Sequence, residues 1–111
     1  MQREILVMKT TVSSTEEARA LTDVLVETGL VACAQCTTAP VESTYVWNGE
    51  VQHEPEFQVW LKTRVDLEAR VRERISEFHP YDVPEILSWP VTANPSYAAW
   101  VDGACRAGDV I

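Results

Sequence analysis

The sequence has 111 residues, of which 46% are hydrophobic, so residues 1–111 are enough for a single domain with a buried core. Seventeen acidic residues against nine basic ones give a net charge of −8, which argues against nucleic acid and anionic membranes as partners. No apolar run approaches the length of a membrane span, and the first residues show no signal-peptide pattern. We therefore expect a cytoplasmic protein.

The first elements along the chain are a strand and a helix. A continuous apolar run at residues 5–8 is typical of a central strand that is covered on both faces. Ser14, with Glu17 three residues later, has the pattern of a capping box and predicts a helix start. Gly29 fits the position just past the end of this helix, where a left-handed backbone is favoured.

A long hairpin follows the first helix. Residues 30–47 are rich in Val, Thr, Ala and Cys and predict one long strand, which Pro40 interrupts with a bulge or an edge position. Asn48-Gly49 is a strong two-residue hairpin signal, because both positions tolerate positive φ. The returning strand covers residues 50–63. The hairpin is thus long compared with usual strands, and we expect it to project beyond the body of the domain.

The second half predicts a helix, a strand and a terminal helix. Asp66 can cap the second helix, and Pro80 ends it because the residue before a proline avoids the α region. Residues 86–91 predict a short apolar strand, and Asn94-Pro95 marks the start of the last helix. The apolar stripe of the second helix consists of Leu67, Val71, Ile75 and Phe78.

The element order is βαββαβ plus a C-terminal helix, and the fold class is α+β. A hairpin between two right-handed crossovers predicts the ferredoxin-like plan, in which two helices cover one face of a four-stranded antiparallel sheet. Trp60 then lies on the bare face, with Tyr45 and Trp47 as further candidates there. Such a face is unusual for a soluble monomer, so we expect oligomerisation through it and through the hairpin. The helix side takes Phe57, Val59 and Leu61.

Residues 79–86 place an imidazole, a phenol and two carboxylates around two prolines. His79 has two interpretations: its imidazole caps the last carbonyls of the helix, or it is a metal ligand or proton donor near neutral pH. Tyr81 and Asp82 lie within reach of it, and Glu85 is a further candidate. One imidazole with two oxygen ligands would suit Zn²⁺ or Cu²⁺, although the spacing matches no strong metal motif.

The remaining reactive side chains indicate structural roles. Cys33 and Cys36 fit a C-x-x-C pattern, but positions i and i+3 of a strand face opposite sides and cannot chelate one ion. We expect these two thiols and Cys105 to be buried or half-buried structural groups. With four glycines and no G-x-S-x-G motif, neither a P-loop nor a serine nucleophile is indicated. An acid–base pair of Glu85 and His79 remains as an enzymatic alternative.

Short segments along nearly the whole chain follow one another in a specific order and spacing. They are Thr11, Ser14, Glu16-Glu17, residues 29–34, residues 43–51, Glu56, residues 61–63, residues 79–86, Pro90-Val91 and residues 97–100. Taken together, these segments resemble the CutA family, the CutA1-type divalent-cation tolerance proteins. Any one of them alone would not be specific.

This resemblance implies a homotrimer of ferredoxin-like subunits similar to the PII signalling proteins. The sheets would face the threefold axis, and the hairpins would reach neighbouring subunits. It also implies a role in the tolerance of divalent metal ions, among which copper is named most often. No catalytic reaction is firmly assigned to the family. We therefore expect no enzyme.

Two sets of site residues follow from the segments and the resemblance. The candidate ligands for a weakly bound divalent metal, Cu or Zn, are His79, Cys33 and Glu85. The candidate lining residues of a cleft between subunits are Lys62, Tyr81, Asp82 and Trp47.

The chain departs from the family pattern at several of these positions. Some family members carry a cysteine at the end of the first strand, proposed to bind copper together with histidines at the end of the second helix. The matching positions here are Thr10 and Phe78-His79, so one of those ligands is retained. Asp82 stands where Glu is commoner, and Trp89 stands where a smaller aliphatic residue is usual.

Two other classes of function remain open at this point. A small-molecule sensor or signalling trimer follows from the likeness to the PII proteins, which is an analogy at the level of the fold. The second class is a structural trimer that anchors an unidentified protein partner.

Overall fold

A four-stranded antiparallel sheet forms the body of the protein in this computed structural model, which describes residues 3–106. The strand order is β2–β4–β1–β5, so the most apolar strand, β1, lies inside the sheet and is paired on both edges. This order confirms the ferredoxin-like, α+β prediction. The strands are β1 (Glu4–Val12), β2 (Cys33–Cys36), β4 (Glu50–Thr63) and β5 (Ile86–Thr92).

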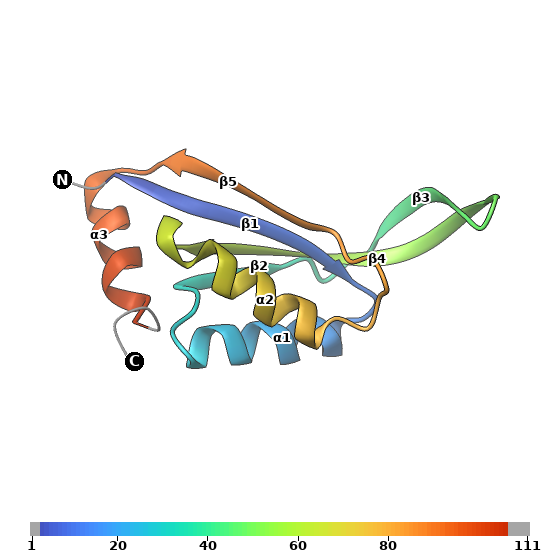
Figure 1. The fold of residues 1–111 in the computed structure, drawn as a ribbon, viewed down its shortest axis with the longest axis horizontal. Helices are drawn as coiled ribbons and strands as arrows, with labels where there is room; N and C mark the ends of the chain where they lie inside the picture. The colour runs from blue at the N-terminus through green and yellow to red at the C-terminus, as the bar shows by residue number, and fades with distance from the viewer. Residues whose placement is uncertain (1–2, 107–111) are drawn as a thin grey trace.

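Two helices cover one face of this sheet, and a third lies at its end (Figure 1). The core between sheet and helices is fully buried. It combines alternate residues of β1 and β4 with the apolar stripes of α1 and α2, as the helical spacing predicts. The helices are α1 (Thr15–Glu27), α2 (Glu68–Phe78) and α3 (Pro95–Ala104). Core side chains without solvent exposure include Met8, Leu21, Leu25, Leu61, Val71 and Ile75.

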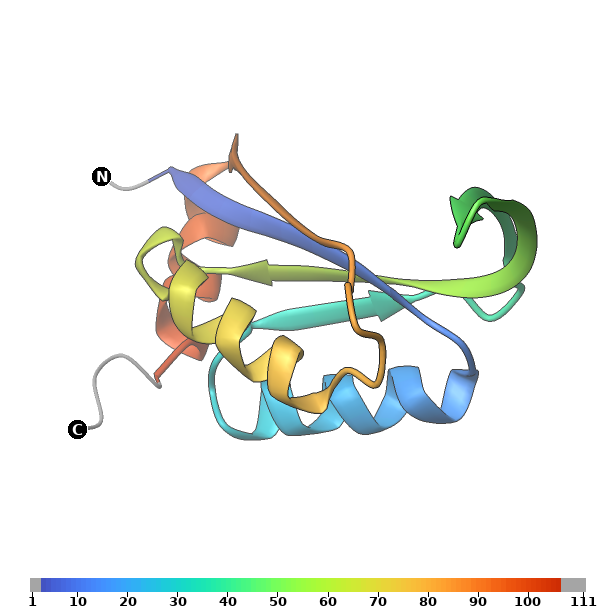
Figure 2. The same cartoon turned by 45° about the vertical axis from the view of Figure 1, so that its right-hand side comes forward.

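The hairpin of β3 (Val41–Trp47) and the outer half of β4 projects from the body and curls at its end (Figures 1 and 2). It makes the molecule 49 Å long against 28 and 23 Å in the other directions. The turn is at Asn48-Gly49, with φ of 52° and 80°, as the Asn-Gly signal predicts. The prediction of a projecting hairpin is therefore confirmed.

The single strand predicted over residues 30–47 is wrong, because the chain forms two strands there. β2 pairs with the inner half of β4, and β3 pairs with its outer half, so both use the same edge of one strand. Thr37 makes the last bonds of the inner pairing: its N–H donates to the Gln58 carbonyl, and its Oγ1 accepts from the Gln58 N–H. Pro40, just before β3, has no N–H to continue the ladder.

Two helix starts differ from their predicted caps. Asp66 does not cap α2, since its carboxylate pairs with Arg64 at 2.6 Å and a 3-10 turn over Val65–Leu67 leads into the helix. At α1, the Ser14 hydroxyl accepts from the Glu17 N–H as predicted. The Glu17 carboxylate reaches back one residue further than a capping box requires and accepts from the N–H of Ser13.

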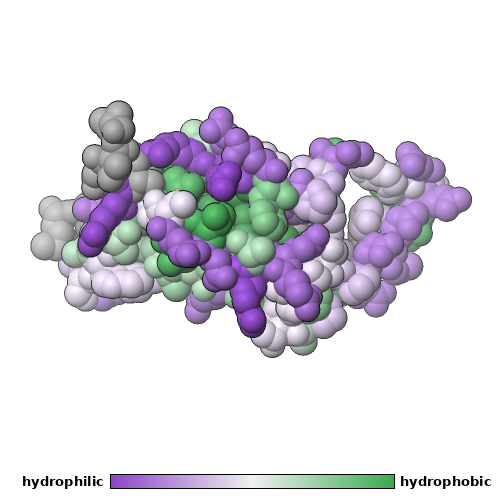
Figure 3. Space-filling view, turned by 90° about the horizontal axis from the view of Figure 1, so that it is seen from below, coloured by the Kyte–Doolittle hydropathy of each residue, from purple (hydrophilic) through white to green (hydrophobic). Residues whose placement is uncertain are grey.

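The face of the sheet opposite α1 and α2 carries large aromatic side chains, as predicted for Trp60. The Trp60 and Trp89 rings meet edge to face, with centroids 6.0 Å apart, and Lys9 Nζ lies 5.7 Å from the Trp60 centroid. Trp89 is 37% exposed and Leu87 is 46% exposed in the isolated chain. On the helix side, apolar side chains gather in the middle and are bordered by hydrophilic ones (Figure 3).

Candidate functional site

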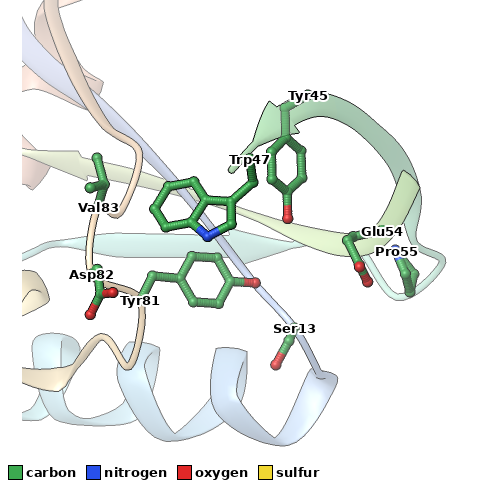
Figure 4. Close-up of a pocket in the computed structure, with 8 residues that line it drawn as sticks. All are labelled: Ser13, Tyr45, Trp47, Glu54, Pro55, Tyr81, Asp82 and Val83. Atoms are coloured by element: carbon green, nitrogen blue, oxygen red, sulfur yellow. The ribbon is translucent and has the colours of Figure 1, made fainter. Parts of the chain in front are cut away.

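A pocket of about 470 Å³ lies between the curled hairpin (Figure 2) and the loop that follows α2. Figure 4 shows the rings of Tyr45 and Trp47, both on β3, turned toward the ring of Tyr81 from the loop. These rings form most of its walls, and carboxylates stand at its edge. The lining residues are Ser13, Tyr45, Trp47, Glu54, Pro55, Tyr81, Asp82 and Val83.

The Glu56 carboxylate fixes one wall of this pocket. Its Oε2 accepts a hydrogen bond from Tyr81 Oη at 3.0 Å and another from Thr11 Oγ1 at 3.2 Å. The same oxygen thus joins the loop, β4 and β1. Burial of the phenol and its bond to the nearby carboxylate hold the pKa of Tyr81 well above its usual range. The hydroxyl therefore stays protonated and donates to Glu56.

His79 holds the start of the loop against β1. The imidazole is buried, and its Nε2 lies 2.7 Å from the Thr11 carbonyl, which can only accept, so Nε2 carries the hydrogen. Nδ1 then accepts from the Tyr81 N–H at 3.3 Å. The predicted cap on the helix carbonyls is therefore wrong: the His79 N–H, not the ring, bonds the Ile75 carbonyl.

The three candidate metal ligands lie apart within one chain. Both ring nitrogens of His79 are occupied by hydrogen bonds, and Glu85 forms an ion pair with Lys9 at 3.0 Å. Cys33 lies on β2 opposite Lys62, further along the sheet. Among residues 3–106, no group of three or more His, Cys, Asp or Glu side chains is arranged to hold a metal ion. These residues of a single chain therefore do not fit a shared metal ion, and His79 and Glu85 are each held by other partners.

Three of the four predicted cleft residues line the pocket, namely Trp47, Tyr81 and Asp82. Lys62 does not, because it lies on the sheet face opposite the helices and donates to the Gln35 side chain. The interpretation from sequence did not place Tyr45 here, and it gave Glu56 no role. The sequence signal for Tyr45 is its spacing from Trp47. The two residues are two positions apart on β3, so both rings emerge on one side of the hairpin.

The three thiols differ in their surroundings. Cys105 is buried and lies 3.6 Å from Thr63 Oγ1, and Cys33 is half-buried. Cys36 is exposed, which corrects the expectation of a buried or half-buried thiol. Desolvation raises the pKa of both Cys36 and Cys105, so neither thiol has the character of an activated nucleophile.

The comparison with protein families decides the membership of the chain. Residues 6–104 match the family described as CutA1 divalent ion tolerance protein. The chain belongs to the CutA1 family. The family resemblance expected from the short segments is confirmed.

Relatives of known sequence and structure agree. The divalent-cation tolerance protein CutA of Thermus thermophilus is 37% identical over 92 residues, which cover 82% of this chain and 88% of that protein. The chloroplastic protein CutA of Arabidopsis thaliana is 32% identical over 91% of this chain, which spans 56% of the plant protein's length. The crystal structure of CutA1 from Oryza sativa has a TM-score of 0.88 at 30% identity, with 94% of this chain and 95% of that one covered.

The family description and the name of the Thermus thermophilus protein refer to tolerance of divalent ions, and neither describes a reaction. One relative is named for the chloroplast. In the part of this chain that the structure describes, no helix has the length and apolar character needed to cross a membrane.

Proposed function

We propose that the chain is a homotrimeric divalent-cation tolerance protein of the cytoplasm, with no catalytic reaction of its own. The family match over residues 6–104 supports the tolerance role. The observation that carries the trimer is the uncovered sheet face, where Trp60, Leu87 and Trp89 come together. An apolar face of this kind marks a protein interface more often than a solvated surface.

Subunit count tests the trimer directly. Light scattering after size exclusion should give three times the 12.5 kDa mass of the chain. Trp89→Glu puts a charge into the proposed interface and should shift the mass toward the monomer. Trp100→Glu is the matched control, because Trp100 is 52% exposed on α3, away from this face. If both variants keep the mass of the unsubstituted protein, and that mass is a monomer's, the sheet face is not an interface.

For the metal, we propose weak binding of Cu²⁺ or Zn²⁺ by ligands from more than one subunit, because one chain does not bring its candidates together. The candidates are His79, Cys33 and Glu85, and His79 would have to release the Tyr81 N–H from Nδ1 to bind the metal. Calorimetric titration of the trimer with each ion should show heat that falls in His79→Ala and in Cys33→Ser. His53→Ala is the control, since this exposed histidine sits on the hairpin beside Glu42. A loss of heat in His53→Ala alone would transfer the site to the hairpin.

A second function is favoured by the pocket itself. We propose that the protein can act as a small-molecule sensor, since a pocket of about 470 Å³ lies within the range of ligand sites in proteins. Thermal-shift measurements with a panel of metabolites, free of added metal, should then show stabilisation by at least one compound. The stabilisation should shrink in Trp47→Leu. If only metal ions, and no metabolite, raise the melting temperature, the sensor function is refuted and the tolerance role remains.

A further inference from the structure

We propose that the pocket formed by Tyr45, Trp47 and Tyr81 binds a small organic cation, an ammonium group carried on an apolar frame. The inference rests on the second proposed function, that this pocket takes a small molecule. It adds the chemical class of that molecule, which follows from the kind of walls the pocket has and from the charges around it.

Three aromatic rings supply the first argument. Tyr45 and Trp47 stand on β3, and Tyr81 faces them from the loop after α2 (Figure 4). The faces of aromatic rings carry negative charge density and attract a cation, and tryptophan attracts it most strongly. Tyr45 and Trp47 remain 44% and 47% exposed in the free chain. Exposed rings on a projecting hairpin add little to the core, so their faces are available to an occupant of the pocket.

The charge around the pocket supplies the second argument. Glu54 and Asp82 are lining residues, and none of the described lining residues is basic. Glu56 accepts a hydrogen bond from the Tyr81 hydroxyl at the back of the pocket wall that this ring forms. Glu17 is near enough for its charge, with that of Glu56, to raise the pKa of the Tyr81 hydroxyl. An anionic ligand would be repelled here, whereas a cation gains from every one of these carboxylates.

The type of cation follows from the walls. A bare divalent metal ion requires several oxygen, nitrogen or sulfur ligands around one point, and residues 3–106 offer no such cluster. An alkylated ammonium group is weakly hydrated and does not need such ligands. It can lie against Trp47 and Tyr81 while the carboxylates at the edge balance its charge. A volume of about 470 Å³ leaves room for an apolar frame beside the cationic group.

Contacts between Tyr81 and its neighbours Glu56 and His79 hold the shape of the pocket and leave its open side free for a ligand. The Tyr81 hydroxyl is bound to Glu56, and the Tyr81 N–H is bound to His79 Nδ1. The ring of Tyr81 also packs edge-on against that of His79, with centroids 4.5 Å apart. One ring wall is therefore fixed before a ligand arrives, which lowers the entropic cost of binding.

A pair of probes of equal shape tests the charge requirement. Choline and 3,3-dimethylbutan-1-ol differ in that the quaternary nitrogen is replaced by a carbon. Titration of each into the full chain, followed by the indole N–H signals in nitrogen-15 spectra, should move the Trp47 signal. We expect choline to bind about tenfold more tightly than the alcohol, because the cation–π and carboxylate interactions exist only for the charged probe. Added salt should weaken choline binding and leave the alcohol unchanged.

Matched variants assign the interaction to the pocket. Glu54→Gln should weaken choline binding about threefold, whereas Glu42→Gln should leave it unchanged, because Glu42 lies on the other face of the hairpin, where it pairs with His53. Trp47→Leu should abolish the preference for choline over the alcohol, and Trp100→Leu should keep it. All four sites are exposed, so the variants should fold, and circular dichroism confirms that they do.

Each outcome has one meaning. Equal binding of both probes keeps the pocket as a ligand site and overturns its preference for a cation. Absence of binding by both probes, together with no hit in the metabolite panel, overturns the ligand pocket as well. Choline binding that survives Trp47→Leu and Glu54→Gln places the cation elsewhere and refutes the proposal.

Discussion

The bond between Tyr81 and Glu56 should stabilise the loop after α2, and a double-mutant cycle can measure how much. Tyr81→Phe removes the hydroxyl that donates to Glu56 Oε2 at 3.0 Å, and Glu56→Ala removes the acceptor. A hydrogen bond to a charged group is worth about 1.5–3 kcal/mol when it is buried. Both side chains are half-buried, so solvent screening reduces this bond to about 1 kcal/mol.

The expected values differ between the two single variants. Tyr81→Phe should lower the free energy of unfolding by about 1 kcal/mol, since one bond is lost. Glu56→Ala should lower it by about 2 kcal/mol, because the Thr11 hydroxyl, at 3.2 Å from the same oxygen, loses its partner too. The double variant should fall about 1 kcal/mol short of the sum of the two, and this difference is the coupling energy.

Equilibrium unfolding in urea measures these energies, with all variants at one protein concentration because subunit association contributes to stability. Hydrogen exchange over residues 79–85 should rise in the same order as the loss of stability. The control cycle pairs Tyr81→Phe with Glu42→Ala. Glu42 is exposed on the other face of the hairpin, where it pairs with His53, so its coupling to Tyr81 should be zero. A coupling between Tyr81 and Glu56 below about 0.3 kcal/mol, the usual error of additivity, would falsify the claim that this bond fixes the loop.

Three further predictions concern pH, the hairpin turn and the thiols. Burial and Glu56 raise the pKa of Tyr81, so its protonated hydroxyl contributes stability below about pH 10, where unfolded tyrosine ionises. This stability is lost as pH rises through the raised pKa. Tyr81→Phe should therefore reduce the fall in the urea midpoint above about pH 10. Gly49→Ala, at φ 80°, should lower the free energy of unfolding by about 1 kcal/mol. Gly103→Ala, in α3 with open space around it, should raise this free energy by up to about 1 kcal/mol. A change of the same sign in both variants would contradict the backbone argument. A thiol reagent should label Cys36 in the native protein and Cys105 only after unfolding, as mass spectrometry of the labelled peptides can show.

The alternation of apolar residues was sufficient to predict the sheet, the helices and the hairpin. Val59 and Leu61 face the helices with no exposure while Trp60 faces the other way, as a period of two requires. The strand over residues 30–47 was predicted as one because β-propensity is similar on both sides of Pro40. Pro40 was a local signal of an interruption, but the point at which β2 ends depends on the bonds of Thr37 to Gln58, which are tertiary.

The contacts of the candidate site were not predictable from the sequence. Tyr81 and Asp82, which the composition of residues 79–86 singled out, line the pocket of the single chain, and their place in a cleft between subunits stays a prediction. The role of His79 was not predictable, because its partner, the Thr11 carbonyl, is 68 residues away in the chain and any backbone carbonyl can accept a bond. The role of Asp66 was not predictable either, because its carboxylate binds Arg64 instead of the backbone N–H groups at the helix start.

β4 connects the two surfaces on which the proposed functions depend. Its inner half carries Trp60 on the face proposed to join the subunits, and its outer half carries Glu54 and Glu56 at the pocket. Only three residues separate Glu56 from Trp60, and the strand between them is paired on both edges by β1 and by the β2 segment. Glu56 and Trp60 therefore belong to one paired strand and not to a loop. In the proposed trimer, another subunit that buries Trp60 would also restrain the strand from which the pocket wall is built. On this argument Trp89→Glu, which acts on the sheet face, should also weaken choline binding at the pocket, although Trp89 does not line it.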